Sequence, residues 1–172
     1  MTPRELLAQQ FRTFTRSAWR LETRDSYAVP AEQASLSMYL ATGELDLAYS
    51  QPWFDSVRAA KAVGRSYARV RVYTEPLTDY LRFEFAVAPF NIEAGEDIRV
   101  MSRPTAASLG LPDYDYWLFD DERVVVMHFD DTTGLVAVDV RTDPDTVSQH
   151  RAWRDLAWSH ADRFATHSTS PP

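Results

Sequence analysis

The stretch YDYWLFDDERVVVMHFDDTTGLVAVDV, which begins at Tyr114, restricts the possible folds of this chain more than any other segment. It contains three runs rich in β-branched and aromatic residues, separated by two short turns rich in aspartate, DDE and DDTTG. Short turns join antiparallel neighbours, so the stretch predicts a three-stranded β-meander. The middle run, residues 124–127, is apolar on both faces, as in a strand with a neighbour on each side.

The rest of the chain alternates between helical and extended patterns. The start TPRE predicts a helix N-terminus, with Thr2 as N-cap, Pro3 in the first turn and Glu5 reaching back to the cap. Amphipathic spacing with glycine stops predicts further helices, and apolar-polar alternation predicts strands. The expected helices cover about residues 3–17, 30–40, 52–63 and 143–164, and the expected strands about 18–23, 66–74 and 95–103, with 104–112 as a loop.

Residues 77–88 fit two periodicities. Large apolar residues occupy every second position from 81 to 87, as in a strand, but an apolar stripe also forms at helical spacing. Because a strand, helix, strand order continues the pattern on either side, we favour a helix, with Pro76 and Pro89 as its start and stop. In that helix, Glu84 lies within the apolar stripe.

These elements predict a single α/β domain over residues 1–165, with α+β as the alternative class. We expect a mixed β-sheet that ends in the meander, helices packed on the sheet and a helix at each terminus. A chain of 172 residues can bury a sizeable core as one domain. The small and polar residues 166–172 predict a disordered tail.

Composition excludes several classes of protein. The net charge of −7 opposes non-specific attraction to nucleic acid and to anionic membranes, and without a helix-turn-helix motif we expect no direct DNA binding. The sequence has no cysteine and no apolar run of membrane-spanning length, which favours a cytoplasmic protein. Its glycines form no nucleotide-binding motif, its histidines form no zinc-binding pair, and we interpret the aspartate doublets as turn residues. We therefore expect no cofactor and no metal.

The densest basic region precedes and follows the strand expected at 66–74. One interpretation is a solvated face on an edge strand, where charges discourage strand pairing. The other is an anion-binding strip, in which arginines and tyrosines act together. The region comprises Arg58, Lys61, Arg65, Arg69 and Arg71, with Tyr67 and Tyr73 between them.

Glu84 needs an explanation because a buried carboxylate is costly unless it is paired. We expect a partly buried ion pair with Arg71, or with Arg20 or Arg24 of the first strand; a catalytic carboxylate is the alternative. We interpret His128, beside a run of valines, as a core histidine rather than a general base.

Aromatic residues at the start of the meander complete a candidate site. Strand alternation sends Tyr116 and Trp117 to opposite faces, so one side packs while the other stays available. If the available side meets the arginines, an aromatic and cationic cleft would bind a small anionic ligand or a partner's acidic loop. The alternative is that these rings only cover the sheet. The residues assigned to this ligand or partner site are Arg69, Arg71, Tyr73, Glu84, Tyr116 and Trp117.

Four stretches, WRLETRDSYAVPAE, RVYTEPLTDYLRFEF, NIEAGEDIRV and YDYWLFD, resemble an actinobacterial domain family of unknown function, family 6879. The resemblance extends over nearly the whole chain, and TEPLTDYLRFE and AGED are its most specific parts. Members are commonly encoded beside XRE-type helix-turn-helix regulators. The resemblance therefore implies cytoplasmic regulatory or accessory work, with such a regulator as a candidate partner, and implies no catalytic residues.

A second resemblance concerns DYDYWLFDDERVVVM, which is similar to the strand, acidic turn and strand after the catalytic histidine of phospholipase D-like enzymes. Ligand-sensing domains of transcription regulators also use that fold. The HxKxxxxD motif of the enzymes falls here on Asp113, Asp115 and Asp120, so only the last residue matches. The resemblance therefore implies a degenerate, sensing domain that lacks the nucleophilic histidine.

Two functions follow as expectations. The first is a non-enzymatic regulatory or accessory protein that binds a partner regulator or a small anionic ligand. The alternative is a degenerate phospholipase D-like hydrolase or another phosphodiester-acting enzyme, with its chemistry around Glu84, Asp115, Asp120 and His128.

Overall fold

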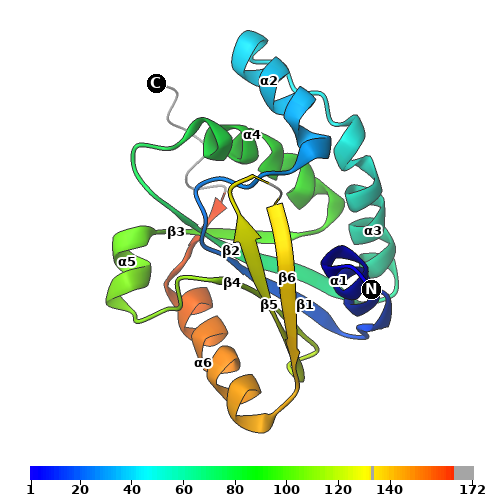
Figure 1. The fold of residues 1–172 in the computed structure, drawn as a ribbon, viewed down its shortest axis with the longest axis vertical. Helices are drawn as coiled ribbons and strands as arrows, with labels where there is room; N and C mark the ends of the chain where they lie inside the picture. Colours follow the sequence, from blue (N-terminus) through cyan, green and yellow to red (C-terminus); the bar gives the residue numbers. More distant parts are fainter. Residues whose placement is uncertain (133, 165–172) are drawn as a thin grey trace.

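The β-sheet organises the molecule, and most of the helices lie against it (Figure 1). A computed structural model describes residues 1–132 and 134–164, so the tail predicted at 166–172 lies outside the described residues. Within the described part the sheet is mixed and has seven strands in the order β6-β5-β4-β1-β2-β3-β7. This confirms the predicted single domain with a mixed sheet, and its class is α+β. The strands are β1 (Ser17–Glu22), β2 (Ser66–Tyr73), β3 (Asp97–Ser102), β4 (Asp115–Phe119), β5 (Arg123–Asp130), β6 (Gly134–Arg141) and β7 (Asp162–Arg163).

The first three strands are parallel, and helices connect them. Parallel neighbours need a crossover connection, because a tight turn joins only antiparallel strands. Residues 79–88 therefore belong to a helix, as predicted, but the helix begins at Asp79 after the Thr78 cap rather than at Pro76. The crossover from β1 to β2 contains the short 3-10 helices η1 (Pro30–Glu32) and η2 (Ala48–Ser50), α2 (Gln33–Thr42) and α3 (Gln51–Ala62), and the crossover from β2 to β3 contains α4 (Asp79–Ala94).

The C-terminal half of the sheet is the predicted meander. β4 is antiparallel to both β1 and β5, and β5 is antiparallel to β6. Asp120 and Asp121 make the turn between β4 and β5 with φ of 56° and 61°, a left-handed conformation that aspartate tolerates better than most residues.

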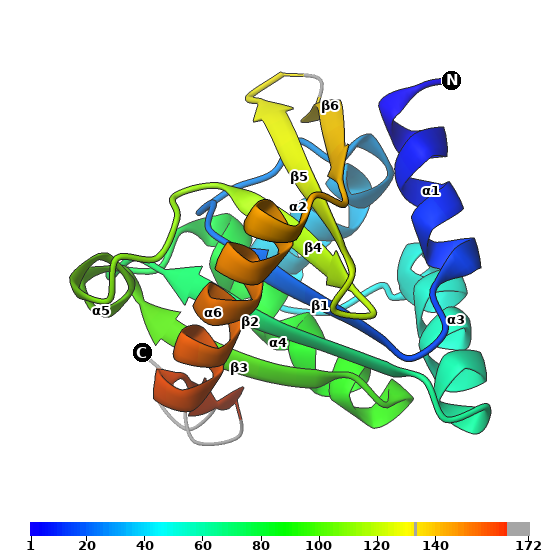
Figure 2. The same cartoon turned by 90° about the horizontal axis from the view of Figure 1, so that it is seen from below.

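Helices cover the sheet on both faces (Figure 2). One apolar core lies between the sheet and the helices α1 (Pro3–Thr13), α2, α3 and α4. A second lies beneath α5 (Arg103–Ser108) and α6 (Pro144–His160) on the opposite face. Trp117 belongs to the first core and Tyr116 to the second, which confirms that these neighbours point to opposite faces. Within the described residues, no helix combines the length and apolar character needed to cross a membrane.

Local caps place the helix ends close to their expected positions. Thr2 and Glu5 form the predicted capping box at the start of α1. Asp143 accepts a hydrogen bond from the Thr146 amide and caps α6. Gly43 follows α2 with φ of 75°, a conformation that glycine adopts without strain.

Four sequence predictions about the elements are wrong. The C-terminal helix expected at 143–164 ends at His160, and β7 follows it. Helix α4 does not stop at Pro89, because burial of Val87 and Ala94 on either side of the proline holds the helix together despite the lost hydrogen bond. The loop expected at 104–112 begins with α5, which the Ser102 side chain caps by accepting from the Thr105 amide. The first helix ends at Thr13 rather than near residue 17, because the chain then turns into β1.

The Asp120 carboxylate fixes the turn that leads from α1 into β1. It accepts hydrogen bonds from the backbone amides of Thr15, Arg16 and Ser17 at 2.8, 2.6 and 3.0 Å. Burial opposes ionisation, but these amide hydrogen bonds outweigh it and lower the pKa of Asp120. These hydrogen bonds join the turn between β4 and β5 to the segment between α1 and β1.

Replacing Asp120 by asparagine should destabilise the fold by about 2 kcal/mol, because an amide has one acceptor oxygen where the carboxylate has two. Asparagine tolerates the left-handed conformation, so the variant isolates the charge and hydrogen bonding. Urea unfolding at pH 7 measures the change, with Asp131→Asn, whose side chain is 90% exposed, as control. Because the pKa is lowered in the folded state, the difference between wild type and D120N should shrink as pH falls below 4. Equal unfolding midpoints for D120N and D131N would contradict this role.

Candidate functional site: a buried ion network beneath a cleft

Charged residues of two parallel strands lie together on one face of the sheet. The register places Arg20 beside Arg69 and Glu22 beside Arg71. Strand alternation sends all four toward the face that α3 and α4 cover, while the residues between them point into the opposite core. Arg69 and Arg71 are only 7% and 6% exposed, so these charges need partners within the protein.

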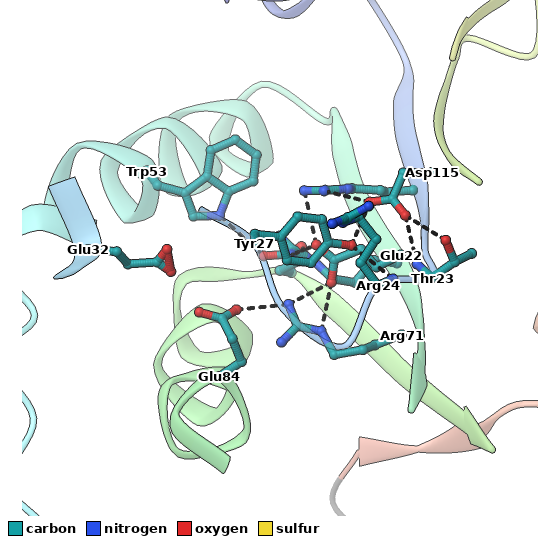
Figure 3. Close-up of polar contacts among 12 residues, drawn as sticks. Glu22, Thr23, Arg24, Tyr27, Glu32, Trp53, Arg71, Glu84 and Asp115 are labelled. Atoms are coloured by element: carbon teal, nitrogen blue, oxygen red, sulfur yellow. Dashed lines mark hydrogen bonds and ion pairs between the residues drawn. The ribbon is translucent and has the colours of Figure 1, made fainter. Parts of the chain in front are cut away.

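Glu22 is the centre of the network and contacts all three arginines. Its Oε1 lies 2.9 Å from Arg20 Nη1 and 3.1 Å from Arg69 Nη1. Its Oε2 accepts a hydrogen bond from Arg71 Nε at 2.7 Å (Figure 3). Burial opposes ionisation of Glu22, but the three guanidinium groups outweigh it and hold its pKa well below the ordinary value. Glu22 is therefore a carboxylate at neutral pH.

Each arginine also has a second carboxylate partner. The second partners come from elements around the strands: from β4, from the segment before β3 and from α4. No guanidinium of the network is therefore left without carboxylate partners. The pairs are Arg20 with Asp115 at 3.1 Å, Arg69 with Glu96, and Arg71 with Glu84 at 2.8 Å.

Hydrogen bonds hold the outer carboxylates in place. Asp115 accepts from the backbone amide and the hydroxyl of Thr23, both at 2.8 Å, and from the Tyr27 hydroxyl at 2.5 Å (Figure 3). Glu96 accepts from Trp53 Nε1 at 3.3 Å, which links α3 to the segment before β3. The network thus fixes the chain after β1 and the position of α3.

Two adjoining cavities, of about 390 and 280 Å³, lie over the network. The larger extends beneath α1 toward Tyr27, Tyr80 and Phe129. The smaller extends toward Tyr49, Trp53 and Trp117. We call the two together the cleft, because they share the lining residues Leu7, Phe11, Arg20, Glu32, Glu84 and Met127.

Glu32 differs from the other carboxyl groups of the cleft. It is 7% exposed, and its side chain accepts hydrogen bonds from the Tyr80 hydroxyl at 3.0 and 3.2 Å. In Figure 3 its carboxyl group and that of Glu84 point toward the same space. Burial, and after it the hydrogen-bonded Glu84 carboxylate, raise the pKa of Glu32 to about 8. Glu32 is therefore mostly protonated at neutral pH.

The structure brings together four of the six residues predicted for the site. Arg69, Arg71 and Glu84 belong to the network, and Trp117 lines the cleft with a face toward the Arg20 guanidinium, 5.6 Å from its ring centre. The predicted pairing of Glu84 with an arginine is confirmed in Arg71.

The other two predicted residues lie elsewhere. Tyr73, at the end of β2, packs in a separate core cluster with Leu81. Tyr116 points to the opposite face and donates a hydrogen bond from its hydroxyl to the His150 carbonyl at 3.1 Å. The alternation that makes Trp117 available removes Tyr116 from the cleft.

Two interpretations of charged residues are corrected. Arg69 and Arg71 do not form a solvated face on an edge strand, because β2 lies between β1 and β3. His128 is not a core histidine; its side chain is 48% exposed and lies 2.8 Å from Asp139 of β6. Met127 and Phe129 on either side of it line the cleft, whereas His128 lies at the surface beside Asp139.

Sequence reasoning missed the carboxyl groups that complete the network. Glu22, Glu32 and Glu96 were not singled out, although Arg20 and Glu22 occupy alternate positions of β1, as Arg69 and Arg71 do in β2. Matching charge alternation on two strands of one sheet would have pointed to Glu22. For Glu32 and Glu96 the sequence has no comparable pattern, because they come from a 3-10 helix and a connecting segment.

The fold and the cleft define a class: an α+β domain with a ligand-sized cavity over a paired ionic network. The chain belongs to the family "Domain of unknown function (DUF6879)", whose model matches residues 5–169. This confirms the resemblance to family 6879. No curated protein shows significant similarity to the chain. Between residues 1 and 164, position 133 apart, no group of three or more acidic or histidine side chains is arranged to hold a metal ion.

Replacing Glu22 by glutamine should destabilise the protein by about 3–5 kcal/mol, because three buried guanidinium groups lose their shared partner. The matched control is Glu122→Gln, since Glu122 pairs with Arg16 at the surface with a 71% exposed side chain and should contribute less than about 1 kcal/mol. Chemical denaturation at pH 7 measures both changes. Similar losses in the two variants would show that the buried network does not hold the fold together.

Glu32 should make the unliganded protein less stable as pH rises. Its pKa is raised in the folded state, so its contribution to stability is complete below the unfolded pKa of 4.5 and is lost as pH rises through about 8. Unfolding free energies of wild type and Glu32→Gln at pH 7 and pH 9 isolate this effect, because glutamine stays neutral. The wild type should lose more stability over this interval than the variant. Parallel losses would mean that Glu32 ionises normally.

Proposed function

We propose that the protein is a cytoplasmic, non-enzymatic regulatory or accessory domain that binds a small organic ligand in the cleft. The observation that carries the proposal is the cleft itself, whose walls are aromatic and whose floor is a charged network held rigid by mutual pairing. Ligand sites commonly combine an apolar lining with a few well-positioned polar groups, at volumes from about 300 Å³ upward.

The geometry gives less support to a phosphodiester-acting enzyme. Asp115 is bound by Thr23, Tyr27 and Arg20, and Asp120 caps backbone amides at the other end of β4. His128 lies at the surface beside Asp139. The residues named for that alternative therefore do not converge on one place where a phosphate would react.

The regulatory part of the proposal derives from the family resemblance. Association with an XRE-type regulator, and the absence of direct DNA binding, stay predictions. Ligand occupancy would reach such a partner through the helices that line the cleft, since α1 and α4 both have an outer face toward solvent. A pull-down with the regulator, in the presence and absence of a cleft ligand, tests this step.

Filling the cleft should abolish ligand binding. Ala8 on α1 lines the larger cavity, so Ala8→Phe places a ring in it. Ala59 is exposed on α3, and Ala59→Phe is therefore the matched control. In a thermal-shift screen of small metabolites, at least one compound should raise the melting temperature of wild type and A59F by several degrees, as expected for a bound ligand in excess.

The same compound should leave the melting temperature of A8F unchanged. A shift of equal size in A8F would place the ligand outside the cleft. Failure of every compound to stabilise the wild type would count against a small-molecule function and leave the partner alone as the candidate.

A further inference from the structure

Glu32 is a buried carboxyl group without a cation. It is more than nine-tenths buried and lines both cavities of the cleft. Within residues 1–132 and 134–164, no basic side chain forms an ion pair with it, whereas the other buried carboxylates of the site each contact an arginine. A buried ionised carboxyl group without a partner is costly. Ionised Glu32 therefore requires positive charge beside it.

The groups that face Glu32 do not supply that charge. Helix α4 contributes Tyr80 and Glu84, and η2 contributes Tyr49, which is also within hydrogen-bonding reach. Arg71 acts on Glu32 electrostatically, but its Nη2 is 2.8 Å from Glu84 and its Nε is bound to Glu22. The remaining charged and titratable groups toward the cleft are Arg20 and Glu22 of β1, Tyr27 after β1, Arg69 of β2 and Arg4 of α1.

Charge balance also disfavours an anion in the cleft. The network contains Arg20, Arg69 and Arg71 against the carboxylates Glu22, Glu84, Glu96 and Asp115, before Glu32 is counted. Every one of these arginines is already held by two carboxylates. An anionic ligand that contacts these arginines would have to displace a carboxylate from a buried pair, which is strongly unfavourable.

The walls of the cleft have the chemistry that receives organic cations. Phe11, Tyr27, Tyr49, Trp53 and Tyr80 all line it. Aromatic faces attract cations and also cover the apolar part of a ligand. A planar amidinium or guanidinium group donates in parallel to carboxylate oxygens, so two neighbouring carboxyl groups suit it.

We propose that the cleft binds a small organic cation, with its amidinium, guanidinium or ammonium group between Glu32 and Glu84 and its apolar part against the aromatic walls. This inference rests on the proposed function, because it names the class of ligand that the cleft takes. The cation supplies the partner that Glu32 lacks, and Glu84 keeps its ion pair with Arg71.

Binding of the cation is linked to loss of a proton. In the unliganded protein Glu32 is mostly protonated at neutral pH, since its pKa is about 8. The cation favours the ionised form, so the Glu32 proton passes to the solvent as the ligand enters. Affinity therefore rises by up to about tenfold per pH unit below pH 8 and becomes constant above it.

Three probes of one shape test the charge preference on the full chain: benzamidine, benzamide and benzoate, which are cationic, neutral and anionic. Isothermal titration calorimetry at pH 6.5, 7.5 and 9 gives the affinities, and buffers of different ionisation enthalpy report the released proton. We expect benzamidine to bind most tightly, with affinity that rises with pH and about one proton released near neutral pH. Tighter binding of benzoate or benzamide would overturn the proposal.

Two variants assign the effect to Glu32. Glu32→Gln should weaken benzamidine about 30-fold or more at pH 9 and remove the pH dependence, because the amide neither ionises nor attracts the cation. Glu93→Gln changes an exposed carboxylate on α4 and should bind as wild type does. Unchanged binding by E32Q would refute the assignment, and its melting temperature at pH 7 shows whether it is folded.

The outcomes also separate this inference from the proposed function. Suppose that the compound that stabilises wild type and A59F but not A8F is neutral or anionic, or binds with no proton release. The cleft is then a ligand site, and the cation assignment fails. If neither benzamidine nor any screened compound binds the wild type, both proposals fail together. Benzamidine binding that persists in A8F would mean that the cation binds elsewhere and would overturn the inference.

Discussion

The contact of Glu22 with three arginines is the interaction on which the rest of the structure depends. A single buried carboxylate shared by Arg20, Arg69 and Arg71 joins β1 to β2 and requires further carboxylates to balance the remaining charge. Those carboxylates come from β4, from α4 and from the segment before β3, so one ionic cluster ties these three parts of the chain to β1 and β2. Removing any member takes a partner from at least one desolvated charge, and this cost makes the cluster rigid.

A rigid ionic floor explains how the cleft stays open and specific. The arginine side chains are held by carboxylates, so they cannot swing into the cavity or collapse on it. Glu32 lies at the border of this cluster, beside Glu84 but without an arginine of its own. A proton therefore neutralises the Glu32 carboxyl group, and a bound cation can take the place of that proton. Because Glu32 has no arginine partner at this edge of the buried network, it is the group of the site whose protonation changes with pH and with a bound cation.

The opposite face of the sheet offsets the cost of the buried charges by apolar packing. Trp19, Val70, Val72 and Leu118 form a core there with α6, and Tyr116 contacts the ring of His150 edge to face. Such burial supplies the non-directional part of stability, whereas the ionic face fixes register and orientation. Side chains alternate along β1 and β2, so the ionic groups lie on one face of the sheet and the apolar groups on the other.

Local pattern determined several elements: the meander and the capping box at Thr2 follow from turn residues and caps, which act over a few positions. Periodicity alone did not decide between helix and strand at 77–88, and the order of the neighbouring elements favoured the helix. The pairing of Glu84 with Arg71 was also predictable, since a carboxylate within an apolar stripe needs a cation. Only the tertiary structure decided that β2 is central, that Trp117 and not Tyr116 lines the cleft, and that Glu22 and Glu32 complete the site. The physical reason is that strand order and the meeting of η1 with α4 depend on contacts between distant residues, and no local periodicity encodes which buried charge is left without a partner.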